Sequence, residues 1–135
     1  MNSLNDVMIK EIAAVKELLS ALDKQHGYIL KNDIFSLEKI VSDIQLINKK
    51  VAQIEMERRQ ITRGQSMRKI IYDLKDEETE NNYRKMKILL QEVKVQNNSN
   101  NLLIKQNLSF TNRMLEVLNP NRQTKVYNSY GKFKR

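Results

Sequence analysis

The sequence predicts an all-α protein, an elongated antiparallel helical bundle or coiled coil of three long helices with a flexible C-terminal tail. Two observations lead to this fold class. Glycine occurs three times and proline once in 135 residues, too rarely for the closely spaced turns of an all-β chain. Apolar residues recur in alternating steps of three and four, the spacing of helices packed at a shallow angle. We expect a bundle domain over residues 1–118 and a tail over residues 119–135.

The first helix is expected from about Leu4 to Lys31, with its carboxylates on the solvated face. Its end is marked by Asn32, which can adopt a left-handed conformation, and by Asp33, which can cap the next helix. We therefore predict a tight turn here, the alternative being a kink in one continuous helix. The residues of the seam are Met8, Ile12, Val15, Leu19, Leu22, His26 and Ile29.

The second helix is expected to follow Asp33 and to end near Gly64. Arg58 interrupts its apolar run but keeps the spacing. A short helix is then expected over residues 67–74, where four apolar residues fall in a helical pattern. The seam of the second helix consists of Leu37, Ile40, Ile44, Ile47, Val51, Ile54, Arg58 and Ile61.

The third long helix is expected to begin near Glu77, because an acidic cluster at residues 76–80 favours a helix N-terminus. Pro120 would stop it. It is the longest of the three, so its end is expected to extend beyond the others. Asn97 and Asn100 take seam positions where leucine is expected, and this asparagine-rich segment should loosen the docking of the apolar residues that follow it.

The composition argues against an enzyme. There is no cysteine for a disulfide or thiolate metal site, the three glycines lie too far apart for a phosphate loop, and His26 is the only histidine. We expect His26 to be a packed or partly exposed seam residue. No catalytic, metal or cofactor site and no small-molecule substrate are predicted. No membrane-spanning segment and no signal peptide are predicted either, so a cytoplasmic location is expected.

The tail holds five of the 24 basic residues and none of the 16 acidic ones. Tyr127, Tyr130 and Phe133 alternate with these cations, a composition that suits stacking on single-stranded nucleic acid or docking onto an acidic protein. A second basic stretch, residues 58–69, lacks interleaved aromatic residues and is more typical of a solvated surface.

An apolar stripe along the end of the third long helix is the candidate binding surface. Such stripes usually belong to a core, but this one follows the asparagine-rich segment on the longest helix. We therefore favour an interaction face that receives another protein's helix. The continuous apolar seams suit a homodimer as readily as a monomeric bundle. The stripe consists of Leu103, Ile104, Leu108, Thr111, Met114, Leu115 and Leu118.

The chain resembles the FlgN family of flagellar type III export chaperones. The similarity lies in "LLSALDKQHGYILKNDIFSLEKI", in "NNLLIKQNLSFTNRMLEVLNP" and in "VYNSYGK", together with size and helical organisation. The resemblance implies a cytosolic chaperone that binds hook-associated proteins, which form the hook–filament junction, through the stripe. It also implies that Tyr127 contacts a coiled-coil component of the export ATPase complex. The alternatives are a coiled-coil protein that binds nucleic acid through its basic tail, and a scaffold without cargo.

Overall fold

The computed structural model describes residues 3–118, with side chains for residues 3–108 and Glu116. This part of the chain contains four helices and no strand, which confirms the all-α prediction: α1 (Ser3–Lys31), α2 (Ile34–Thr62), α3 (Met67–Leu74) and α4 (Glu77–Leu118). Residues up to Asn100 form one compact unit, and those from Asn101 belong to a second. The predicted flexible tail lies outside the described residues.

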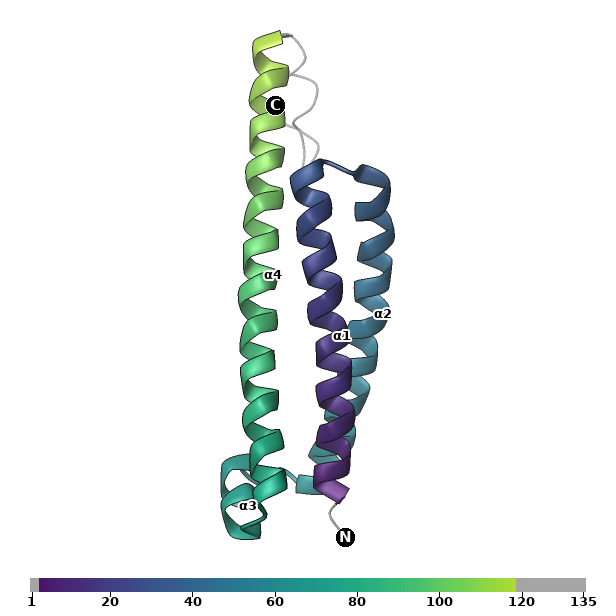
Figure 1. Cartoon of the computed structure of the whole chain (residues 1–135). Coiled ribbons are helices and arrows are strands. Elements are labelled where there is room, and N and C mark those ends of the chain that lie inside the picture. Colours follow the sequence, from purple (N-terminus) through teal and green to yellow (C-terminus); the bar gives the residue numbers. More distant parts are fainter. Residues whose placement is uncertain (1–2, 119–135) are drawn as a thin grey trace. The chain divides into compact units, whose positions relative to one another are not determined.

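Helices α1 and α2 form an antiparallel hairpin (Figure 1). Asn32 adopts the left-handed conformation with φ 55°. Asp33 then caps α2, since its carboxylate accepts hydrogen bonds from the Ser36 amide at 3.2 Å and the Ser36 hydroxyl at 2.7 Å. The predicted tight turn is confirmed, and the alternative of one kinked helix is wrong.

A ladder of opposite charges joins the two helices of the hairpin. The Nζ atom of Lys10 lies 2.8 Å from a carboxylate oxygen of Glu57, and that of Lys50 lies 3.2 Å from a carboxylate oxygen of Glu17. The rungs are seven residues apart on each helix and their polarity alternates. A shift of one helix by one rung would therefore place like charges opposite each other, so the ladder favours this register.

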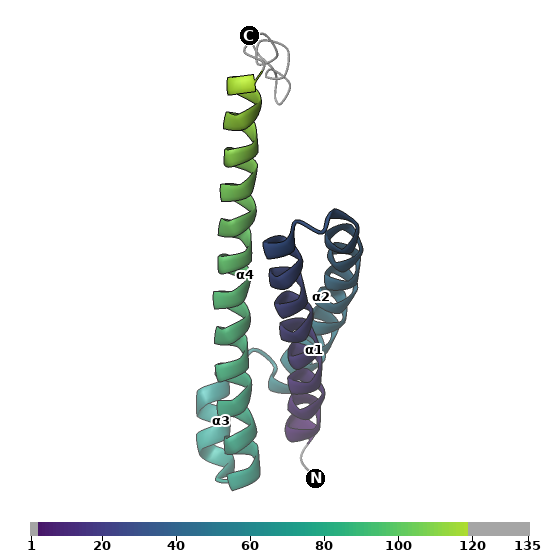
Figure 2. The ribbon, with the colours of Figure 1, turned by 45° about the horizontal axis from the view of Figure 1, so that its top comes forward.

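The first part of α4, residues 77–100, runs parallel to α1 in an up-down-up arrangement (Figures 1 and 2). The core lies mainly between these two segments and is completed by single residues of α2 and α3. Hydrogen bonds from Asn5 to Glu78 at 3.1 Å and from Asn82 to Asn5 at 2.7 Å close its lower end. The buried core residues are Leu4, Val7, Met8, Ile12, Ala14, Val15, Ile54, Ile71, Met86 and Leu89.

The connection between α2 and α4 contains the predicted helix end and the predicted short helix. Helix α2 ends at Thr62, and Arg63 and Gly64 both take positive φ angles. The short helix expected here is α3, whose Ile71 is buried in the core. Asp76 accepts hydrogen bonds from the amide and the hydroxyl of Thr79. That cap explains why α4 begins at Glu77, as predicted.

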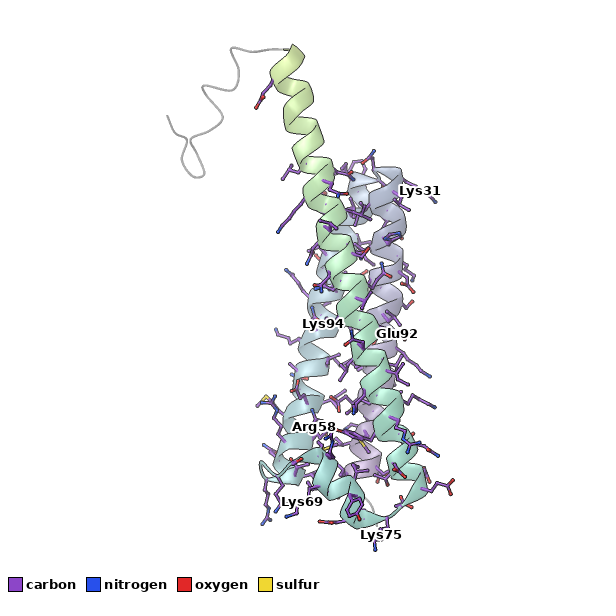
Figure 3. All side chains as sticks on the ribbon, turned by 90° about the vertical axis from the view of Figure 1, so that its left-hand side faces the viewer. Lys31, Arg58, Lys69, Lys75, Glu92 and Lys94 are labelled. Carbon is purple, nitrogen blue, oxygen red and sulfur yellow. The ribbon has the colours of Figure 1, made fainter. Side chains whose placement is uncertain are left out.

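The carboxylates of α1 are not all solvated, and the prediction is wrong for Glu11. Its side chain is only 2% exposed, and one of its oxygens lies 2.9 Å from Nε of Arg58. Burial raises the pKa of Glu11, while the guanidinium of Arg58 opposes that rise. Arg58, labelled in Figure 3, occupies the seam position predicted for it because it neutralises this buried acid.

Candidate partner-binding surface

Three side chains of the predicted stripe are described. Leu103 is half-buried, whereas Ile104 is 38% and Leu108 is 61% exposed. The other four positions of the stripe lie in the helical backbone of α4, but their side chains are outside the described ones. Tyr127 also lies outside the described residues. The described part of the stripe therefore presents large apolar side chains to solvent, as an interaction face requires.

The stripe continues the face of α4 that packs on α1 in residues 77–100. An α-helix turns by about 100° per residue, so positions 3, 4, 7, 11, 14, 15 and 18 residues apart share one face. Counted from the buried Asn100, six stripe residues stand at +3, +4, +11, +14, +15 and +18, and Leu108, at +8, lies at the edge of this face, about 80° from Asn100. One continuous helical face thus serves first as bundle core and then, beyond Asn100, as the candidate surface.

Asn100 marks the end of the covered part of that face. Its side chain is fully buried, and its amide nitrogen donates to the Leu22 carbonyl at 2.8 Å and to Oε1 of Gln25 at 2.9 Å. Its oxygen accepts from Nε2 of Gln96 at 2.9 Å and contacts Nδ1 of His26 at 3.2 Å. Buried hydrogen bonds thus satisfy the whole amide of Asn100.

The same network fixes the role of His26. Because Oδ1 of Asn100 can only accept, Nδ1 of His26 must carry the hydrogen of that bond. His26 is partly exposed and lies on the seam, which confirms the reading of it as a packed seam residue. Its side chain joins the hydrogen-bond network of Asn100 from α1.

A second line of exposed apolar side chains on α4 was not predicted. Ile88, Val95 and Leu102 follow one another at intervals of seven residues, and each is more than half exposed. They stand roughly 120–160° around the helix from Asn100. Sequence reasoning missed this line because one apolar residue per heptad, without a partner at the third or fourth position, is not a bundle pattern.

The basic stretch at residues 58–69 does not form one free surface. Arg58 is occupied by Glu11, and Arg59 pairs with Glu55 at 2.6 Å. Within the described residues, no group of three or more potential metal ligands comes together. No helix in the described part of the chain is long and apolar enough to cross a membrane.

Comparison with family models places the whole chain, residues 1–135, under the model described as FlgN protein. No curated protein and no solved structure matches the chain.

Proposed function

Because the chain belongs to the FlgN family, whose members are flagellar export chaperones, we propose that it binds hook-associated proteins of the hook–filament junction. The binding surface is the stripe on α4. It covers an amphipathic helix of the cargo, prevents premature self-association, and keeps the cargo competent for delivery to the type III export apparatus. The cytoplasm is the compartment in which this would take place.

The exposure of Leu108 and Ile104 on an otherwise core-forming helical face is the observation that carries the proposal. Each large aliphatic side chain that becomes fully buried contributes roughly 1.5–3 kcal/mol. Ordering and association together cost several kcal/mol, so a contact of this size gives capture that can be reversed. A carrier that must release its cargo needs that balance.

The tail gives the chain a second point of attachment. We place the contact with the coiled-coil component of the export ATPase complex at Tyr127, within a basic segment that follows the end of α4. The end of α4 then carries the cargo surface, while residues 119–135 act as a tether to the export machinery. Cargo and export machinery would be bound through separate segments.

Copurification from a flagellated bacterial lysate tests the proposal, with the protein tagged at its N-terminus. Leu108→Asp places a charge on the most exposed described residue of the stripe and should abolish capture of a hook-associated protein. Leu46→Asp is the matched control, since Leu46 is 68% exposed on α2 and outside the stripe. Both substitutions replace an exposed leucine, so the helical content and thermal unfolding of each variant should match the native chain.

Recovery of the same hook-associated protein with all three chains would remove the stripe from the proposal. Recovery of nucleic acid by all three chains, with no flagellar protein, would instead favour the basic tail as the functional segment.

A further inference from the structure

The side of α1 that faces away from the core carries another line of residues in alternating steps of four and three. Each member comes one residue after a member of the apolar seam of α1, so it lies about 100° around the helix from that seam. Every member except the half-buried Gly27 is exposed. The line, here called the outer line of α1, consists of Ile9, Ala13, Lys16, Ser20, Asp23, Gly27 and Leu30.

The other helical segments of residues 3–100 leave the outer line open. Ile9 is 47% and Leu30 is 64% exposed, although both are large aliphatic residues. Shallow grooves lie on both sides of the line, two toward α2 and one toward α4. A Cβ atom added at Gly27 would meet nothing within 4 Å. Packing within this part of the chain therefore does not require a glycine there, although a glycine inside a helix is destabilising.

The two charges of the outer line are not neutralised within the described residues. Neither Lys16 nor Asp23 takes part in any of the ion pairs of this part of the chain. Lys16 stands four residues before Ser20, and Asp23 stands three residues after it. Opposite charges thus flank the middle of the line, and an exposed aliphatic residue stands at each end. The outer line therefore complements itself when it is read in the opposite direction.

We propose that the outer line of α1 binds the outer line of a second copy of this chain, with the two α1 helices antiparallel. Lys16 of each copy then faces Asp23 of the other copy, so that two ion pairs form. Ile9 of each copy packs on Leu30 of the other, which covers the exposed aliphatic residues at both ends. The contact extends over 21 residues of each helix, about 32 Å at 1.5 Å per residue.

The middle of the contact consists of small residues. Ala13 lies opposite Gly27 of the second copy, and Ser20 lies opposite its own counterpart. These side chains allow the two helix backbones to approach closely, so that the aliphatic and charged groups can meet. The space beside Gly27 is then filled by the second helix, which gives this glycine a packing role.

Charge complementarity selects both the second copy and its direction. In a parallel pair of α1 helices, Lys16 would face Lys16 and Asp23 would face Asp23, which is unfavourable. In the antiparallel pair both contacts join opposite charges. Lys10 and Lys31 would approach each other at the two ends, but Glu57 already neutralises Lys10 at 2.8 Å.

This inference goes beyond the proposed function and does not depend on it. It uses α1 alone, whereas the stripe lies on α4. Association of the purified protein can therefore be measured without any cargo, and its outcome leaves the copurification test unaffected.

Sedimentation equilibrium of the full chain at several concentrations tests the proposal. We expect a dimer with a Kd of roughly 10–100 µM, because each copy contributes only one helix to the contact. Lys16→Asp and Asp23→Lys each place two pairs of like charges in the contact and should raise the Kd about tenfold. An equimolar mixture of these two variants should associate as tightly as the native chain, because every facing pair in the mixed dimer is again opposite in sign.

Two further variants separate the contact from net charge and from folding. Lys49→Asp makes the same change of net charge at an exposed position of α2 and should leave the Kd unchanged. Gly27→Gln should abolish the dimer, because its side chain holds the two helices apart. At concentrations where the native chain is monomeric, Gly27→Gln should also raise the midpoint of thermal unfolding, since glycine is a poor helix former. Loss of the dimer in this variant would then not result from unfolding.

Cysteine cross-linking determines the direction of the two helices, because the native sequence contains no cysteine. A mixture of Ala13→Cys and Gly27→Cys chains should form disulfide-linked dimers about fivefold faster than Ala13→Cys chains alone, because only the mixture brings two cysteines face to face.

A native chain that remains monomeric up to about 1 mM would overturn the proposal. So would a dimer whose Kd is unchanged by the charge variants and by Gly27→Gln, because another surface would then join the two copies. Faster cross-linking of Ala13→Cys chains alone would show a parallel pair and would also overturn it.

Discussion

The ion pair of Glu11 and Arg58 places a charge inside the hairpin, where each group depends on the other. Arg58 is 14% exposed and is the only cation within 4 Å of the Glu11 carboxylate among the described side chains. Removing one partner of a buried pair leaves an uncompensated charge, whereas replacing both with apolar groups is often neutral or stabilising. Substituting one partner, and then both, therefore distinguishes the effect of the ion pair from the effect of side-chain packing.

We expect Arg58→Met to lower the free energy of unfolding by about 3 kcal/mol, and Glu11→Met with Arg58→Met to recover most of that loss. Urea denaturation followed by circular dichroism measures both. A double variant no more stable than the single one would show that the methylene groups of Arg58, and not its charge, matter.

The raised pKa of Glu11 gives the second prediction, which concerns pH. The folded chain binds a proton at Glu11 more readily than the unfolded chain, whose carboxyl titrates near 4.5. The resulting stabilisation is fully present below pH 4.5 and is lost as the pH rises through the folded pKa. The native chain should therefore lose stability relative to Glu11→Gln across that interval. Urea denaturation of both chains at a series of pH values measures this. A free energy of unfolding of the native chain, relative to that of Glu11→Gln, that stays constant or increases with pH would contradict the prediction.

The partners of Glu11 and Asn100 were not identified from the sequence, although both residues are buried. A count of helical spacing shows which face of a helix is apolar, but the partner of a polar residue lies on another helix. Glu11 is neutralised 47 residues along the chain, and Asn100 bonds to a carbonyl 78 residues away. Such pairings depend on register, which the spacing pattern of one helix does not contain.

At the scale of elements, the sequence was more informative. The turn between α1 and α2 was predicted because Asn32 and Asp33 act locally, through a left-handed conformation and a cap. The start of α4 was predicted because acidic residues favour a helix N-terminus. The stripe was predicted from the same periodicity. Ile104 and Leu108 of the stripe are exposed, and the role of the stripe as a binding surface stays a prediction. Leu102 and the rest of the second apolar line were missed because they recur only every seventh residue, with no apolar residue three or four positions away on the same side.

The charge ladder of the α1–α2 hairpin yields the element-scale prediction. Glu17→Lys places two lysines on one rung and should destabilise the hairpin, while adding Lys50→Glu should restore it with the polarity reversed. We expect a coupling energy of about 0.5 kcal/mol, since both side chains are exposed. A double-mutant cycle in low and high salt measures it. Coupling that does not weaken in high salt would argue against an electrostatic origin.

At the scale of the whole molecule, stability should be distributed unevenly along α4. Residues 86–100 bury Met86, Leu89 and Asn100, whereas Leu102 and Leu108 beyond them are exposed. Backbone amides after Asn100 should therefore exchange hydrogen faster than those before it. Asn100→Ala should increase exchange around residues 96–104, and Asn97→Ala, at an exposed position, should not. Uniform exchange along α4, measured by mass spectrometry, would contradict this prediction.

The same hydrogen-exchange measurement can be repeated with a saturating amount of cargo. Binding at the stripe should slow exchange after Asn100 and leave residues 86–100 almost unchanged. Protection confined to the α1–α2 hairpin would place the cargo elsewhere.

Two polar contacts between α4 and α1 also limit how the length of α4 can vary. Asn82 bonds to Asn5 and Asn100 bonds to Leu22, so both must face α1. They are 18 residues apart, which is five full turns at 3.6 residues per turn. Inserting one or two residues between them would rotate everything that follows by about 100° or 200°, while seven or eleven would restore the orientation to within about 20°. Insertions and deletions between these asparagines in related chains should therefore occur in such whole-turn steps.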